Sequence, residues 1–232
     1  MRRSHAILWD IDGTLLRAAG AGVRCFVDAL ASVTGLPFPT GDLDMGGRTD
    51  PEIARRILHF AEADGDHDEL AEAMLVELAR IYAERDAEFA GHTKVLGGAA
   101  AAIDALAEQG AVQTVVTGNI RPVAELKLIA AGLAHRLQLD LGGYGSDHLL
   151  RAELVRTARR RITEAVGEID PANTWVVGDT PRDLDCARAA GVRCLLVATG
   201  TNPIEKLAGL GADAAVPDLN DLDRVLAALE CD

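Results

Sequence analysis

The sequence has no long hydrophobic run. No apolar stretch in its 232 residues approaches the roughly 20 residues that a membrane-spanning helix requires. The N-terminal segment also lacks the hydrophobic stretch of a signal peptide, because Asp10 and Asp12 interrupt its apolar residues. These absences predict a cytoplasmic protein without a membrane partner.

Closely spaced cysteines, metal-binding histidine patterns and an excess of basic residues are also missing. Cys25, Cys186, Cys194 and Cys231 show no close pairing, so we expect reduced thiols rather than a zinc site or a disulfide framework. The six histidines are scattered, without the spacing of a metal site. The net charge of −13 argues against a nucleic-acid partner, since such proteins usually carry a basic surface. An anionic small molecule needs only a few local cations and is not excluded.

Short apolar runs alternate with amphipathic stretches over most of the chain. The runs predict strands at 6–9, 112–116, 137–141, 174–177 and 193–198. The amphipathic stretches predict helices at 98–108, 122–131, 151–166, 181–190, 203–210 and 221–229. Such alternation predicts an α/β fold, in which helices cover both faces of a parallel sheet.

The segment 17–92 interrupts this alternation. It holds helical stretches at 22–34, 51–63 and 67–90 and no convincing strand. We expect a helical insertion that lies over the strand ends, where it could act as a cap. The predicted division is a core domain of residues 1–16 and 93–232 and a cap domain of residues 17–92.

Small polar and acidic residues follow three of the predicted strands. The strand 6–9 leads into DIDGT, the strand 112–116 into TGN, and the strand 174–177 into GDTPRD. Ligands of parallel α/β sheets bind outside the carboxyl ends of the strands. We therefore expect these three strand ends to meet at one site.

In DIDGT, Asp10 and Asp12 lie two residues apart, and an extended chain would point both carboxylates to the same side. Two neighbouring carboxylates are costly unless a cation joins them or their pKa values differ. A nucleophile and a proton carrier require such a difference. By itself, the motif also fits a simple Asp-Gly turn.

The other two motifs also allow more than one interpretation. In GDTPRD, Thr180 and Asp183 suit an N-cap and a capping-box acid around Pro181. That helix start does not explain Asp179, whereas a magnesium ion would. In TGN, the Thr117 hydroxyl and the following N–H groups suit phosphate oxygens, although a polar loop is the alternative.

Together, DIDGT, TGN and GDTPRD resemble the motifs of the haloacid dehalogenase superfamily of phosphatases, over nearly the whole chain. The resemblance is to the branch with phosphoglycolate phosphatase and beta-phosphoglucomutase. It implies a Rossmann-like core, a helical-bundle cap and Mg²⁺-dependent chemistry through a phosphoaspartyl intermediate. Asp10 would attack phosphorus and bind Mg²⁺. Asp12 would act as general acid and then general base, and its backbone carbonyl would bind the metal.

The resemblance also implies roles at the other two strand ends. Thr117 would hydrogen-bond the transferring phosphoryl group, with Gly118 and Asn119 as further substrate-binding residues. Asp179 would bind Mg²⁺ and Asp183 would support that metal site.

One family feature is absent. A lysine usually precedes the penultimate core strand, but the corresponding stretch here, GGYGSDHLLRAEL, contains none. Arg151 is the best positional match, since arginine can hold a phosphate oxygen in a bidentate fork. Lys127, on the helix after TGN, is its rival, and it also fits a solvated helix lysine.

In the predicted cap, GGRTDPE offers Arg48 as a candidate for contact with the substrate. Thr49 and Asp50, before Pro51, also fit an ordinary helix start.

The leading expectation is a phosphatase that hydrolyses a small phosphorylated metabolite, with phosphoglycolate as one candidate. A sugar-phosphate mutase would share every core residue named above. A carbon–halogen hydrolase fits less well, because those relatives lack an acid at the position of Asp12. A non-catalytic binding protein of the same fold often loses a carboxylate, whereas Asp10, Asp12, Asp179 and Asp183 are all present. The physiological substrate and the oligomeric state cannot be read from the sequence.

Overall fold

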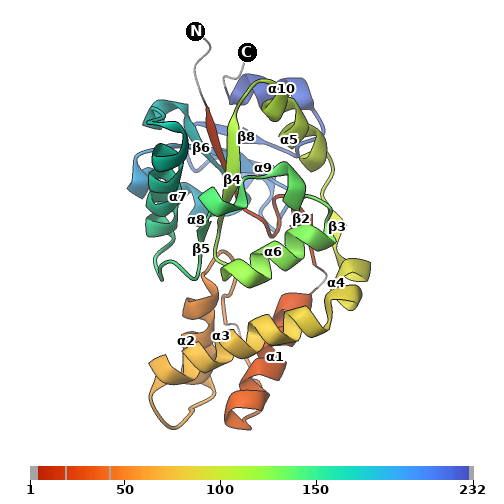
Figure 1. Cartoon of the computed structure of the whole chain (residues 1–232), viewed down its shortest axis with the longest axis vertical. Helices are drawn as coiled ribbons and strands as arrows, with labels where there is room; N and C mark the ends of the chain where they lie inside the picture. Colours follow the sequence, from red (N-terminus) through yellow and green to blue (C-terminus); the bar gives the residue numbers. More distant parts are fainter. Residues whose placement is uncertain (1–4, 19, 42, 230–232) are drawn as a thin grey trace.

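The computed structural model describes residues 5–18, 20–41 and 43–229 (Figure 1). In this part of the chain a six-stranded sheet has the order β5-β4-β1-β6-β7-β8, and all its neighbouring strands are parallel. The strands are β1 (Ala6–Trp9), β4 (Val112–Thr117), β5 (Gly143–Tyr144), β6 (Thr174–Gly178), β7 (Arg193–Val197) and β8 (Ala214–Val216). The predicted α/β fold is confirmed.

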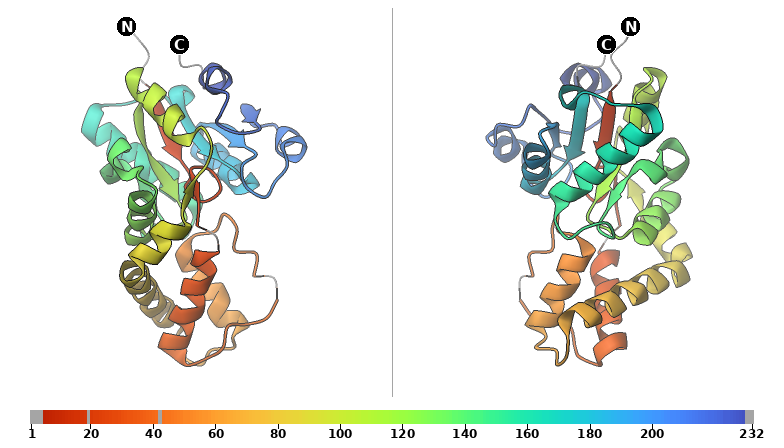
Figure 2. Two further views of the ribbon diagram at one scale, coloured as in Figure 1. Left: turned by 90° about the vertical axis from the view of Figure 1, so that its right-hand side faces the viewer. Right: turned by 60° about the vertical axis from the view of Figure 1, so that its left-hand side comes forward.

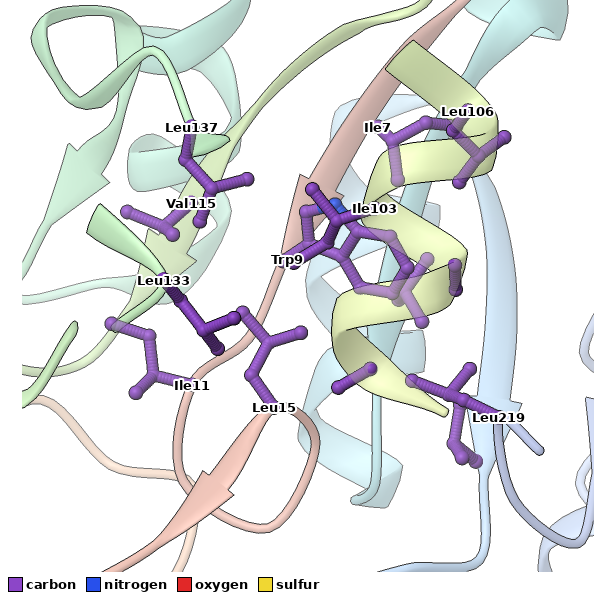
Figure 3. Packing of buried hydrophobic residues seen from close by; sticks show 14 of the residues in the cluster. Ile7, Trp9, Ile11, Leu15, Ile103, Leu106, Val115, Leu133, Leu137 and Leu219 are labelled. Carbon is purple, nitrogen blue, oxygen red and sulfur yellow. The ribbon is translucent and has the colours of Figure 1, made fainter. Parts of the chain in front are cut away.

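Strand β1 lies in the middle of the sheet, and all four of its residues are buried. Ile7 and Trp9 belong to the hydrophobic cluster on one face, and Leu8 to the cluster on the other. Figure 3 shows Ile7 and Trp9 beside Ile103 and Leu106 of helix α5 (Ala99–Glu108). Because helices cover both faces, the strand has no solvent side, and its sequence is a continuous apolar run rather than an alternating one.

Helices form a layer on each face of the sheet. Side chains of α5, α6 (Arg121–Ala130) and α10 (Leu222–Ala228) pack into the cluster that contains Trp9. Side chains of α7 (Arg151–Val166), α8 (Pro181–Ala190) and α9 (Ile204–Ala208) pack into the cluster that contains Leu8. This double cover makes the carboxyl ends of the strands the open edge of the core.

A second group of helices lies beyond that edge (Figure 2). It consists of α1 (Ala21–Thr34), α2 (Asp50–Phe60), α3 (His67–Glu84) and α4 (Asp86–His92), which we call the cap together with the loops that join them. These helices share a hydrophobic cluster that extends to Ile120 and Val123 at the start of α6. Strands β2 (Leu16–Arg17) and β3 (Lys94–Val95) pair antiparallel where the chain enters and leaves the cap. The domain boundaries expected from the sequence stay a prediction.

The strand predicted at 137–141 is wrong. Residues Leu139–Leu141 form a 3₁₀ turn, and the edge strand is β5, which follows it. Gln138 hydrogen-bonds to β4: its N–H donates to the Gln113 carbonyl (2.9 Å) and its carbonyl accepts from the Thr114 hydroxyl (2.7 Å). Leu137 and Leu139 pack with the cluster that contains Trp9, and Leu141 packs against the cluster that contains Leu8, so the run crosses from one face of the sheet to the other instead of forming a strand.

Several further elements differ from the sequence predictions, and β2 and β3 are among those that were not predicted. Strand β8 was not predicted, because its short sequence AAV is rich in alanine and has little β propensity. The helix predicted at 67–90 is interrupted at Arg85, which separates α3 from α4.

No helix in the described ranges is long and apolar enough to cross a membrane. Cys25, Cys186 and Cys194 are free, as their spacing predicted, and Cys231 lies outside the described residues. Burial raises the pKa of the Cys25 thiol to about 11 and that of Cys186 to about 12, so both thiols are protonated at neutral pH.

Candidate active site

A pocket of about 620 Å³ lies between the cap and the carboxyl ends of β1, β4 and β6. The three polar strand ends therefore meet, as the parallel topology required. The wall on the core side includes Asp10, Asp12, Thr117, Asn119, Lys127, Arg151 and Asp179. The wall on the cap side is mostly apolar and includes Val23, Phe26, Met45, Ile53, Leu78 and Tyr82.

Asp10 lies directly after β1 and is 5% exposed. Its Oδ1 accepts a hydrogen bond from Nη2 of Arg151, at 3.1 Å. Burial raises the pKa of Asp10 well above its ordinary value, and the neighbouring carboxylates Asp183, Asp179 and Asp12 raise it further, while Arg151 opposes the shift. The Asp10 carboxylate thus needs positive charge beside it to stay ionised.

Asp10, Asp179 and Asp183 form a compact acidic triad. Each offers a carboxylate oxygen, and these oxygens lie within 4.8 Å of one another. Burial, with Asp183 adding to it, raises the pKa of Asp179 to about 7. A Cβ at Gly200 would lie 1.7 Å from Oδ2 of Asp179, so the chain closes tightly around that carboxylate. Three buried carboxylates with one guanidinium beside them fit a hard divalent cation, which prefers oxygen ligands.

Arg151 joins two members of the triad. Its Nη2 donates to Asp10 and to Oδ1 of Asp183, and its Nη1 donates to the carbonyl of Gly47 in the cap, at 3.2 Å. Burial opposes the charged guanidinium, but Asp183 and Asp10 outweigh it and raise the pKa of Arg151. Asp183 also completes the predicted capping box of α8, because its Oδ2 accepts from the N–H of Thr180 (3.0 Å). The side chain of Asp183 therefore both caps the start of α8 and binds Arg151.

Lys127 is not a solvated helix lysine, and that alternative is wrong. The residue is 6% exposed, and its Nζ donates to Oδ2 of Asp12 (2.6 Å) and to Oδ1 of Asn119 (2.8 Å). Burial lowers the pKa of Lys127, but Asp12, Tyr82 and Asp50 together raise it above the ordinary value. Both candidate cations thus enter the site: Arg151 contacts Asp10, and Lys127 contacts Asp12.

The TGN loop packs directly against the cap. Thr117 ends β4, and its Oγ1 accepts from the N–H of Asn119 (3.3 Å). A Cβ at Gly118 would lie 2.0 Å from the carbonyl oxygen of Arg48, which is closer than any side chain allows. Glycine is therefore required at position 118 for the cap loop to approach the core.

Arg48 lines the pocket, and its side chain is held by acids on both sides. It contacts Oδ2 of Asp44 (2.7 Å) and the carboxylate of Glu52. These hydrogen bonds raise the pKa of Arg48 despite its partial burial.

Asp50 is a site residue that the sequence did not reveal. It is 3% exposed, and its carboxylate accepts from the N–H of Ile120 (2.8 Å) and from Nδ2 of Asn119 (3.4 Å). Burial raises its pKa to about 6, although Lys127 and the Ile120 N–H favour the charged form. An acid before proline at a helix start is common. The sequence therefore contains no signal that Asp50 also binds Asn119 and Ile120 at the pocket.

The sequence is similar to those of known hydrolases and phosphatases. Residues 7–188 match the model of the haloacid dehalogenase-like hydrolases. A phosphoglycolate phosphatase of Cupriavidus necator is 30% identical over 222 residues, which cover 95% of this chain and 92% of the relative. The chain belongs to the haloacid dehalogenase-like hydrolase family. An N-acetylmuramic acid 6-phosphate phosphatase of Pseudomonas putida is 29% identical over 233 residues, 99% of each chain.

Family membership and these relatives make this haloacid dehalogenase-like hydrolase a phosphatase, as the motifs predicted. The fold is shared with solved structures. The crystal structure of CbbY from Rhodobacter sphaeroides in complex with phosphate superposes with a TM-score of 0.74 at 20% identity, covering 98% of this chain and 99% of that one. The expected Rossmann-like core with helices on both faces is thereby confirmed.

Nine of the ten candidate site residues from the sequence line the pocket of this phosphatase. Asp10, Asp12, Arg48, Thr117, Gly118, Asn119, Lys127, Arg151 and Asp179 line it, and Asp183 is bonded to one of them, Arg151.

Proposed function

We propose that this phosphatase hydrolyses small phosphate monoesters through a phosphoaspartyl intermediate on Asp10, in a magnesium-dependent reaction. The observation that carries the proposal is the pairing of two carboxylates with two different cations. Asp10 contacts Arg151 in a buried triad, while Asp12 contacts Lys127 on the same pocket. A nucleophile and a proton carrier require such different surroundings.

In the first step, the Asp10 carboxylate attacks phosphorus, and the bond from phosphorus to the ester oxygen breaks. A carboxylate nucleophile divides one difficult displacement into two easier ones. Arg151 offsets negative charge beside Asp10, and the Thr117 hydroxyl with the N–H groups of Gly118 and Asn119 holds phosphoryl oxygens. Positioning and charge compensation are the main requirements of phosphoryl transfer.

Asp12 moves the proton in both steps. It gives its proton to the leaving oxygen, which departs as an alcohol, and then accepts a proton from the water that attacks the phosphoaspartate. That second attack breaks the bond between phosphorus and the Asp10 oxygen and regenerates the free carboxylate. Lys127 holds the Asp12 side chain between these tasks.

Magnesium would be held by Asp10, Asp179 and the backbone carbonyl of Asp12, with Asp183 in support. When bound, it supplies positive charge against the phosphoryl oxygens and offsets the three carboxylates. The buried oxygen set and its shortage of positive charge support this assignment.

Phosphoglycolate is the first candidate substrate, because the Cupriavidus relative carries that name. N-acetylmuramic acid 6-phosphate is the second candidate, because the Pseudomonas putida relative is named as a phosphatase of that compound. Arg48 lines the cap side of the pocket and is the candidate contact for a carboxylate of either molecule.

The test is the release of inorganic phosphate from a panel of phosphorylated metabolites by the wild type and by Asp10→Asn. We expect the variant to lose turnover by at least about a thousandfold, as for other catalytic nucleophiles. Asp213→Asn is the matched control, since Asp213 pairs with Arg193 and the Cys194 N–H away from the pocket. EDTA should abolish activity and Mg²⁺ should restore it. An Asp10→Asn protein with wild-type turnover would refute the proposal, and isomer formation from a sugar 1-phosphate without phosphate release would make the enzyme a mutase.

A further inference from the structure

A chain of polar side chains connects the cap to Asp12. Asp50, the first residue of α2, accepts a hydrogen bond from Nδ2 of Asn119 at 3.4 Å. Oδ1 of Asn119 accepts from Nζ of Lys127 at 2.8 Å, and the same Nζ donates to Oδ2 of Asp12 at 2.6 Å. Asp50 and Lys127 are both buried, so water cannot easily replace these partners.

The order of donors and acceptors leaves Asn119 a single orientation. A lysine ammonium only donates hydrogen bonds, and an ionised carboxylate only accepts them. Asn119 must therefore turn its carbonyl toward Lys127 and its NH₂ toward Asp50. A flipped amide would place donor against donor at one end and acceptor against acceptor at the other.

Asp50 is itself fixed to the core by contacts that do not involve Asn119. Its backbone N–H donates to the Gly118 carbonyl at 2.7 Å, and its Oδ2 accepts from the N–H of Ile120 at 2.8 Å. Ile120 is the N-cap of α6, where its own side chain caps nothing. The carboxylate of Asp50 therefore also faces the positive end of the α6 dipole, which favours it there.

We propose that Asp50 is a positioning residue that acts on Asp12 from the cap. By fixing the orientation of Asn119, it places the Lys127 ammonium, and Lys127 in turn places the Asp12 carboxylate in the pocket. The inference rests on the proposed function, in which Asp12 transfers the proton. If the inference holds, Asp12 is correctly placed as general acid and base only while α2 contacts the TGN loop.

Asp50→Asn tests the order of donors and acceptors in the hydrogen bonds from Asp50 to Asp12, with almost no change in side-chain size. The new amide oxygen can still accept from the Ile120 N–H, but its NH₂ would meet the NH₂ of Asn119. We expect kcat on para-nitrophenyl phosphate to fall about tenfold or more, since small misplacements of a catalytic group cost up to about a hundredfold. KM should stay within about threefold, because asparagine leaves the shape of the pocket nearly unchanged.

The double variant Asp50→Asn/Asn119→Asp restores the polarity with the same total charge. The carboxylate introduced at position 119 can accept from Lys127 and from the amide introduced at position 50. We expect kcat to rise severalfold above that of Asp50→Asn without reaching the wild type, because the carboxylate introduced at position 119 also lies beside the phosphate site. Arg182→Gln is the matched control, because Arg182 contacts the Gly46 carbonyl and Asp44 and so joins the cap loop to the core without contacting Asn119 or Lys127. Its kcat should stay within about twofold of the wild type.

The outcomes separate this inference from the proposed function. A wild-type kcat for Asp50→Asn, a double variant no faster than Asp50→Asn, or an equal loss in Arg182→Gln would each overturn the positioning role. If circular dichroism shows that Asp50→Asn does not fold, the double variant alone decides. Loss of activity in Asp10→Asn with no effect of Asp50→Asn removes only the inference, whereas an active Asp10→Asn removes the proposed function itself.

Discussion

Replacing Asp179 by asparagine should stabilise the metal-free phosphatase at pH 8 and reduce its response to magnesium. Asp179 lies in a triad of buried carboxylates whose oxygens are within 4.8 Å of one another, with Arg151 as the adjacent cation. The ionised side chain therefore costs folding free energy. Asparagine has nearly the same shape and carries no charge.

The magnitude follows from the pKa of Asp179, which rises from 3.8 to about 7 on folding. At about 1.4 kcal/mol per pKa unit, the ionised group costs about 4 kcal/mol. Two like charges at 4.8 Å repel by a similar amount, about 3.5 kcal/mol, at an effective dielectric constant of about 20. For a protein of this size, in which 1 kcal/mol shifts Tm by about 2–4 °C, we expect the Tm of Asp179→Asn to exceed that of the wild type by roughly 8–16 °C in EDTA.

The pH dependence has a definite sign. The pKa of Asp179 is higher in the folded protein, so its contribution to stability is fully present below about pH 4 and is lost as the pH rises through about 7. The Tm advantage of Asp179→Asn should therefore be full at pH 8 and roughly half or less at pH 5.

Differential scanning calorimetry of both proteins, in EDTA and in Mg²⁺, is the assay. Magnesium at a hundred times its Kd should stabilise the wild type by about 2.7 kcal/mol, and it should act less on the variant, which lacks one carboxylate. The reasoning is refuted if Asp179→Asn melts at or below the wild type in EDTA at pH 8, or if Mg²⁺ raises both Tm values equally.

Two further substitutions test the surroundings of the triad and the cap contact. Arg151→Lys keeps the charge but loses the guanidinium, whose Nη2 donates to both Asp10 and Asp183 and whose Nη1 donates to the Gly47 carbonyl. We expect kcat/KM to fall about tenfold to a hundredfold and inorganic phosphate to inhibit more weakly, and unchanged kinetics would contradict a role for the guanidinium. Gly118→Ala would place a Cβ against the Arg48 carbonyl, a backbone atom that cannot move alone. We expect a loss of about 1–3 kcal/mol in a thermal melt and a higher KM, whereas a wild-type melt would show that the cap loop is not held at this contact.

The sequence determined most of the core and most of the site. Apolar runs such as 6–9 are buried on both faces in a parallel sheet, and the acids after them gather at the carboxyl edge because all parallel strands end there. The prediction failed at 137–141, where a 3₁₀ turn at Leu139–Leu141 sends the apolar side chains to the hydrophobic clusters on both faces of the sheet. A short apolar run has the same pattern in either case, so periodicity cannot separate them.

Only the tertiary structure decided which cation serves which carboxylate. Arg151 and Lys127 both fitted one role in the sequence, since each stands near the start or end of a helix that follows a core strand. The fold brings Arg151 to Asp10 and Asp183, and it buries Lys127 beside Asp12 and Asn119. The carboxylate partners lie 32 to 141 positions from these cations along the chain, so no local pattern encodes them.

Asp50 shows the same limit most clearly. Its local sequence specifies a helix start and nothing more, and the structure confirms that α2 begins there. Its second role depends on α6 presenting the N–H of Ile120 and the amide of Asn119 to a cap residue 70 positions away. Local sequence determines elements through short-range sterics and burial pattern, whereas such long-range contacts depend on how the finished elements pack.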